Sequence, residues 1–197
     1  MQIEDQIRDL LHETTSIFEV VENNQAFIKQ IIRAYELMRE TFRFEGKILI
    51  FGNGGSAAQA QHFAAELVCQ FEKKRRALPA IALNTDSSIL TAQSNDSGFE
   101  YIFSRQIEAL GRRGDLAIGL TTSDADINRR HSYNILNAFL TAKNLKLHSM
   151  GLFSQRTQSL LKFVDAPVIV PSDSTALTQE IHQRIIHILC SLIEAWL

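Results

Sequence analysis

The chain has 197 residues, 45% of them hydrophobic, which suits one domain with a sizeable core, alone or with an added helical element. The net charge of −2 gives no reason to expect binding to nucleic acid or anionic membranes, and the basic cluster at 73–76 fits a solvated loop better than a binding patch. No run of about 18 apolar residues predicts a membrane span. We see no basic and apolar leader, and two cysteines without CxxC spacing indicate reduced thiols, so we expect a cytoplasmic protein.

Residues 1–45 contain neither glycine nor proline and carry apolar residues at helical spacing. They predict two helices, broken near Asn23 and Asn24, that form an N-terminal helical extension. The apolar stripes of these helices suit packing against the chain's own core and packing against a second subunit equally well.

From residue 46 onward, short apolar runs alternate with helix-like stretches. The apolar runs predict five strands at 48–51, 80–83, 116–120, 147–152 and 168–170. The intervening stretches predict helices over 57–71, about 99–111, 126–144, 155–162 and about 178–195, the last with Ser174 or Thr178 as its cap. This alternation predicts an α/β domain over 46–197, with helices on both faces of a doubly wound, mostly parallel sheet.

The most informative segment follows the first predicted strand and reads Gly52-Asn53-Gly54-Gly55-Ser56. It matches neither GxGxxG nor a P-loop, so a nucleotide is not indicated. Ser56 and Gln59 have the spacing of a capping box, which predicts that Ser56 caps the following helix. Backbone N–H groups at a helix N-terminus suit an anion or a polyhydroxyl ligand. A plain strand-to-helix turn would carry the same pattern.

His62 and Glu66 stand at i and i+4, on one face of that helix. They fit a metal site, and they fit an ordinary amphipathic helix equally well. His182 and His187 lie among isoleucines near the C-terminus, where a histidine is more often a satisfied core residue. Gln179 and His187 are eight residues apart, about 80° in rotation and roughly 12 Å along a helix axis. Spacing alone therefore does not pair them on one metal.

A hydroxyl loop follows the third predicted strand and consists of Thr121, Thr122 and Ser123. Three hydroxyls at a strand end can donate to phosphate oxygens, and they can equally cap a helix. Asp124 and Asp126 come directly afterwards. As ionised carboxylates they would repel a phosphate dianion unless they are turned away or neutralised.

Taken together, these segments resemble the phosphoheptose isomerases of the sugar-isomerase (SIS) family. The similar segments are GNGGSAAQAQHFAAEL (52–67), PAIALNTD (79–86), SND with GFEYIFSRQIEALG (94–111), GDLAIGLTTS (114–123), VIVPSD (168–173) and QEIHQRIIHILC (179–190). The resemblance covers most of residues 46–197 and is weakest in the N-terminal helices. It implies the SIS, flavodoxin-like version of the doubly wound fold.

The resemblance also implies an activity, the conversion of sedoheptulose 7-phosphate to D-glycero-D-manno-heptose 7-phosphate for ADP-heptose and lipopolysaccharide synthesis. It implies a zinc ion (Zn2+) bound by His62, Glu66, Gln179 and His187, with Glu66 and His187 as the catalytic base and acid. The implied substrate contacts are Asn53, Gly54, Gly55, Ser56, Glu66, Asn95, Asp96, Thr121, Thr122, Ser123 and Gln179. Members of the family are typically homotetramers with active sites between subunits.

Several positions depart from the family pattern. The family's Ser-Gly-Asn-Ser loop matches residues 123–126, which places Asp126 where the last serine helps to hold phosphate. Two arginines of the family are replaced by Gln70 and Leu177, and its glycine cluster after the fourth strand by 154–156. These departures predict weakened phosphate binding, a different substrate or lost activity.

A non-enzymatic function is the alternative. Relatives on the SIS fold include a replication-initiation regulator that binds DnaA, and a sugar-phosphate sensor without turnover is a further version. The segments AAQAQHFAA and LPAIALNTD resemble the DnaA-binding branch. Members of that branch tend to lack the residues kept here as Glu66 and His187, which favours the enzyme.

Overall fold

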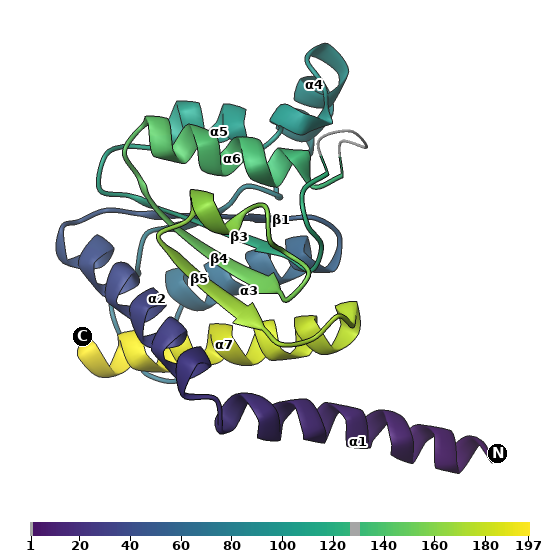
Figure 1. Ribbon diagram of the computed structural model, residues 1–197. Helices are drawn as coiled ribbons and strands as arrows, with labels where there is room; N and C mark the ends of the chain where they lie inside the picture. Colours follow the sequence, from purple (N-terminus) through teal and green to yellow (C-terminus); the bar gives the residue numbers. More distant parts are fainter. Residues whose placement is uncertain (1, 127–130) are drawn as a thin grey trace.

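The computed structural model describes residues 2–126 and 131–197 and has a single parallel sheet between two layers of helices (Figure 1). The sheet has five strands in the order β2-β1-β3-β4-β5, and all neighbours are parallel. The predicted five-stranded doubly wound α/β fold is therefore confirmed. The strands are β1 (Ile48–Gly52), β2 (Ala80–Ala82), β3 (Leu116–Thr121), β4 (His148–Ser154) and β5 (Ala166–Val170).

The two faces of the sheet bury alternate residues of each strand, as a period of two requires. Ile48 and Ile50 of β1 belong to one hydrophobic core, and Leu49 and Phe51 belong to the other. The described helices, including two short 3-10 turns, are α1 (Ile3–Glu22), α2 (Gln25–Arg43), α3 (Gly55–Val68), α4 (Ser87–Asp96), η1 (Phe99–Tyr101), α5 (Ser104–Leu110), α6 (Tyr133–Asn144), η2 (Leu161–Phe163) and α7 (Thr175–Trp196). Helices α2, α3 and α7 cover the first core, and α5 and α6 cover the second (Figure 1).

The helices differ from the sequence prediction in three places. Helix α4 was not predicted, because none of its residues is buried and no apolar stripe marks it. The predicted helix at 99–111 is split into η1 and α5, and the one at 155–162 is wrong, since only the turn η2 forms near its end. The predicted helix over 126–144 is observed as α6 from Tyr133, and residues 127–130 lie outside the described part of the chain.

The N-terminal helices break where predicted, because the side chain of Asn24 accepts hydrogen bonds from the backbone N–H groups of Ala26 and Phe27 and so caps α2. Helix α2 packs along β5 and α7, whereas α1 extends away from the sheet (Figure 1). The division of the chain between residues 45 and 46 remains a prediction. Within the described residues, no helix combines the length and the apolar content needed to cross a membrane.

The strand order creates a switch point beside β1. The chain leaves β1 for β2 at one edge and then returns to β3 on the opposite side of β1. Ligands of open α/β sheets bind at such points, outside the carboxyl ends of the strands. The loop at 52–56 after β1, called the glycine loop from here on, and the hydroxyl loop at the end of β3 meet there.

Candidate active site

A cavity of about 520 Å3 lies at this switch point. It brings together many of the predicted substrate contacts: Asn53, Gly54, Gly55, Ser56, Thr121, Thr122, Ser123 and Gln179. Its wall also includes residues that the sequence analysis did not single out: Phe99, Leu120, His131, Ser132 and Thr175. The glycine loop and the hydroxyl loop thus form two walls of one site.

Three helices begin at this cavity. Helix α3 begins at Gly55, α7 begins at Thr175, and Ser132 directly precedes the first residue of α6. All three residues line the cavity. The N-terminus of a helix carries roughly half a positive charge and unpaired N–H donors, so three of them together favour an anionic group.

The glycine loop starts α3 through its backbone. Gly54 is the N-cap with a φ of +55°, a region that favours glycine, and no side chain caps the helix. The predicted capping box is therefore wrong: Ser56 lies buried in the first turn, and the Gln59 amide donates to the carbonyl of Gln179. A Cβ on Gly55 would lie only 2.5 Å from Nε2 of Gln179, so glycine there gives this amide its place in the wall.

Asn53 is held by a partner that the sequence analysis missed. Its side-chain amide pairs with the amide of Asn134 through two hydrogen bonds of 2.9 and 2.8 Å. Asn134 is buried in the first turn of α6, where its side-chain oxygen also accepts from the N–H of Ile135. The pair fixes one wall of the cavity and joins the glycine loop to α6.

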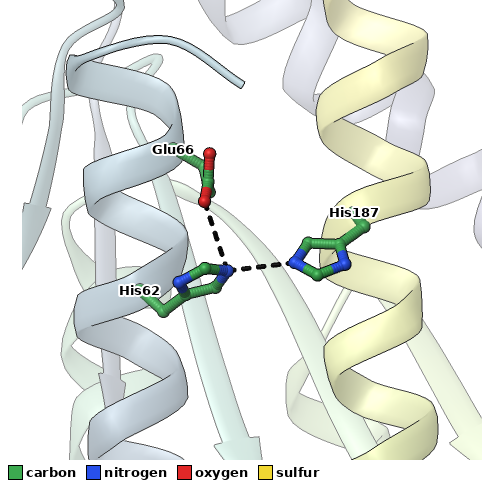
Figure 2. A group of neighbouring side chains, drawn as sticks. All are labelled: His62, Glu66 and His187. Atoms are coloured by element: carbon green, nitrogen blue, oxygen red, sulfur yellow. Dashed lines mark hydrogen bonds and ion pairs between the residues drawn. The ribbon is translucent and has the colours of Figure 1, made fainter. Parts of the chain in front are cut away.

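Three residues that could bind a metal, His62, Glu66 and His187, form a cluster between α3 and α7 (Figure 2). We call it the histidine cluster. The Nε2 atoms of His62 and His187 lie 3.0 Å apart, and Nε2 of His62 lies 3.4 Å from a carboxylate oxygen of Glu66. One ligand atom from each of the three residues lies within 4.8 Å of the others. Two helices distant in sequence thus deliver two imidazoles and a carboxylate to one point.

The imidazole of His187 is positioned by two further side chains. The ring of Phe71 stacks on it, with centroids 5.3 Å apart, and Nε2 of Gln183 lies 2.9 Å from its Nε2. Burial and then the neighbouring His62 lower the pKa of His187, and Glu66 opposes them. The ring is therefore neutral at neutral pH, which is the form that binds a metal or accepts a proton.

Comparison with known proteins identifies the family. Residues 10–151 match the model of the SIS domain. A phosphoheptose isomerase of Campylobacter jejuni is 47% identical over 176 residues, 89% of this chain and 91% of the relative. The chain belongs to the phosphoheptose isomerase family. A further relative of that name, from Geotalea daltonii, is 45% identical over 96% of this chain and 95% of its own length.

Solved structures of the phosphoheptose isomerase family have the same fold over their whole length. The structure from Neisseria gonorrhoeae has a TM-score of 0.89 at 34% identity and covers 98% of this chain and 100% of its own. The structure from Francisella tularensis has a TM-score of 0.90 at 34% identity and covers 99% and 100%. These matches confirm the fold of α1 and α2 together with that of the sheet.

Three residues implied by the phosphoheptose isomerase resemblance lie apart from the histidine cluster. Gln179 lines the cavity, eight residues before His187 on α7, and its place among metal ligands remains a prediction. Asn95 and Asp96 lie on α4, hydrogen-bonded to each other. Asp96 lines a separate cavity of about 540 Å3, so a role in this site also remains a prediction for both residues.

The loop at 123–126, which departs from the phosphoheptose isomerase pattern, keeps both of its carboxylates out of the described cavity wall. The Asp124 carboxylate accepts from the N–H and the hydroxyl of Ser159, the latter at 2.6 Å, and Asp124 does not line the cavity. Asp126 is also absent from the described lining, whereas the hydroxyl of Ser132 lies 3.4 Å from that of Ser123. Asp124 is therefore turned away from the cavity, which is the case in which the sequence analysis expects no repulsion of phosphate.

Two other expectations are corrected around α7, one for Arg75 and one for His182. Arg75, expected in a solvated loop, is buried: it pairs with Glu194 at 3.0 Å and donates to the carbonyls of Glu66 and Leu67 at the end of α3. His182 is fully buried as expected, but neither ring nitrogen makes a hydrogen bond of good geometry among the described residues, and the backbone of Phe153 offers only a weak one. Burial lowers its pKa to about 4, opposed only in part by the backbone of Phe153.

Proposed function

We propose that this protein is a zinc-dependent aldose–ketose isomerase that converts sedoheptulose 7-phosphate to D-glycero-D-manno-heptose 7-phosphate. The observation that carries the proposal is the convergence of His62, Glu66 and His187 from two helices, near a cavity that suits an anion. The names and the identity of the relatives support the same activity. They do not favour the non-enzymatic alternative.

The three residues fit zinc by chemistry and by spacing. Two histidines and one glutamate are a donor set of catalytic zinc sites, which keep a further position for water or substrate. Tetrahedral zinc with bonds of about 2.0–2.1 Å needs ligand atoms about 3.3 Å apart. The distances of 3.0 and 3.4 Å measured from Nε2 of His62 lie on either side of that value. His62, Glu66 and His187, with Gln179 as the fourth residue, would hold the ion.

The chemistry divides between the two ends of the substrate. Zinc, when bound, supplies Lewis-acid polarisation of the sugar carbonyl. The Glu66 carboxylate takes the proton from the carbon next to the carbonyl and returns it to the neighbouring carbon, and the neutral His187 exchanges a proton with the sugar oxygens. The phosphate binds to the hydroxyl loop and the three helix N-termini, which line the cavity.

We further propose a cytoplasmic homotetramer acting in ADP-heptose and lipopolysaccharide precursor synthesis. Helix α1 supports assembly, because five of its apolar side chains are more than half exposed: Ile3, Ile7, Leu10, Leu11 and Val20. In such an assembly α4, with Asn95 and Asp96, would reach the substrate of a neighbouring subunit. Light scattering after size exclusion tests the tetramer.

The decisive experiment is a zinc-dependent assay. Protein stripped with a chelator is reloaded with zinc, its metal content is measured, and the aldose product of sedoheptulose 7-phosphate is quantified. We expect product only from zinc-loaded protein, at least 100-fold less from Glu66→Gln, and no loss from the matched control Glu108→Gln on α5. No product above the level of Glu66→Gln, from wild type with bound zinc, counts decisively against the proposal.

A further inference from the structure

The cavity wall carries little positive charge for a sugar phosphate. A phosphate monoester holds between about one and a half and two negative charges at neutral pH. Among the described residues that line the cavity there is no lysine or arginine, and His131 is the one side chain that can become a cation. Helix N-termini supply only partial charges, so a full positive charge has to come from a residue beside the cavity lining.

Arg156 contacts two residues of the cavity wall, although it does not itself line the cavity. It follows β4, and its Nη2 atom lies 3.1 Å from the carbonyl of Thr122 and 3.1 Å from the hydroxyl of Thr175. Both threonines line the cavity, and their hydroxyls lie 3.4 Å apart. The guanidinium therefore joins the hydroxyl loop to the first residue of α7, directly beside the cavity wall.

The charge of Arg156 is not neutralised within the described residues. None of the ion pairs found there includes it, and of its guanidinium nitrogens only Nη2 makes hydrogen bonds to those residues. A guanidinium has five N–H donors in a planar fork that matches phosphate oxygens. An exposed cation with donors left over, beside hydroxyls and helix N-termini, is what an incoming phosphate requires.

His131 approaches the same hydroxyls from another segment. Its Nε2 atom lies 2.9 Å from the hydroxyl of Ser123, which in turn lies 3.4 Å from the hydroxyl of Ser132. Ser132 has a φ of +52°, so the backbone turns sharply between His131 and α6. The hydroxyl loop is thus flanked by Arg156 at Thr122 and by His131 at Ser123.

We propose that Arg156 and His131 bind the phosphate group of the substrate together with the hydroxyl loop. Arg156 supplies the full positive charge, and His131 supplies a nitrogen donor beside Ser123. This inference rests on the proposed function for the identity of the sugar. It does not rest on it for the binding of phosphate, which can be measured without turnover.

The experiment measures two quantities in parallel. The first is the affinity for inorganic phosphate, titrated by calorimetry at low ionic strength, and the second is the KM for sedoheptulose 7-phosphate. We expect Arg156→Ala to weaken phosphate binding about tenfold or more, as the loss of a charge-assisted hydrogen bond does, with a similar rise in KM. His131→Ala should weaken it several-fold, and Arg156→Lys less than Arg156→Ala. The control Arg113→Ala, an exposed arginine away from the cavity, should leave both unchanged.

The outcomes separate this inference from the proposed function. One outcome overturns the inference alone. In it, the wild type isomerises the sugar, and Arg156→Ala is folded by circular dichroism and keeps the full phosphate affinity and the same KM. Wild type that forms no product, yet loses phosphate affinity on Arg156→Ala, supports the inference and rejects the function. Wild type that does not bind inorganic phosphate at all overturns the inference.

Discussion

Phe71 stacks on His187 with the ring planes inclined by 23°, although Phe71 lies outside α3 and α7. The N–H of Phe71 is held in turn by the carboxylate of Glu194, at 2.8 Å. A loop between α3 and β2 therefore orients a residue of the histidine cluster. Partners that orient a metal ligand commonly account for about 10- to 100-fold in metal affinity.

Replacing Phe71 with leucine should weaken zinc binding about tenfold, because the imidazole of His187 loses the flat surface that fixes its plane. Competition with a chromophoric chelator measures the affinity. Phe44→Leu is the matched control, since Phe44 is exposed and far along the chain from the cluster. Equal affinities for the two variants would contradict a positioning role for Phe71.

Replacing Glu194 with glutamine should destabilise the protein by about 3 kcal/mol at pH 7, because it leaves the buried Arg75 without a counter-ion. Burial raises the pKa of Glu194, but the N–H groups of Phe71, Glu72 and Lys73 and the charge of Arg75 bring it below its usual value. The stabilisation is therefore present above the unfolded pKa and is lost as pH falls through the folded pKa. Urea unfolding at pH 7 and at pH 3 tests both points, and a variant deficit that does not shrink at pH 3 would refute the pH argument.

The burial of His182 predicts a stability that falls in mild acid. Its folded pKa is about 4 against an ordinary value of 6.5, so the unfolded chain binds the proton first as pH falls below 6.5. Between pH 7 and pH 5 this costs the wild type about 2 kcal/mol. The free energy of unfolding is measured in urea with a chelator present. His182→Leu should lack this decrease between pH 7 and pH 5, whereas the exposed-site control His12→Gln should keep it. If the free energy of unfolding of His182→Leu falls between pH 7 and pH 5 as much as that of the wild type, other groups cause the decrease.

The two glycines at the start of α3 should respond differently to alanine. Gly54→Ala forces φ +55° on a residue with a Cβ and should lower the free energy of unfolding by about 1–3 kcal/mol. Gly55→Ala adds helix propensity but displaces the amide of Gln179, so we expect unchanged or higher stability with at least tenfold lower activity. Thermal unfolding and the isomerase assay on both variants test this contrast. Full activity in Gly55→Ala would show that the position of Gln179 is not critical.

The sequence was sufficient for the sheet because its strands are short apolar runs with clear breaks, and the central strands β1 and β3 are fully buried. The run at 116–120 is observed as Leu116–Thr121, with every residue buried. Helix α4 was missed for the opposite reason, since a helix that buries nothing leaves no apolar period. The ends of α3 were misjudged because Gly54 starts the helix through its backbone, and a serine two residues later gave a capping signal that the fold does not use.

The candidate site was only partly accessible from sequence. His62 and Glu66 share a helix face, but nothing in local spacing joins them to His187, 125 residues away from His62, and the resemblance alone suggested it. Matching the family's Ser-Gly-Asn-Ser loop to 123–126 without a gap assigned the place of its last serine to Asp126. In the fold, Ser132 lines the cavity instead. Arg156 was noted only as part of the departure at 154–156, because its relation to Thr122 and Thr175 exists only where β3, β4 and α7 meet.

The buried pair of Arg75 and Glu194 has a practical consequence for anyone shortening the chain. Glu194 lies in the last turn of α7, and three consecutive backbone amides around Phe71 depend on it. Deleting the residues from Glu194 onward would remove only a few side chains, yet it would release the loop that supports His187. A trimmed protein that still folds should therefore be tested first for loss of the zinc binding that we propose for His62, Glu66 and His187.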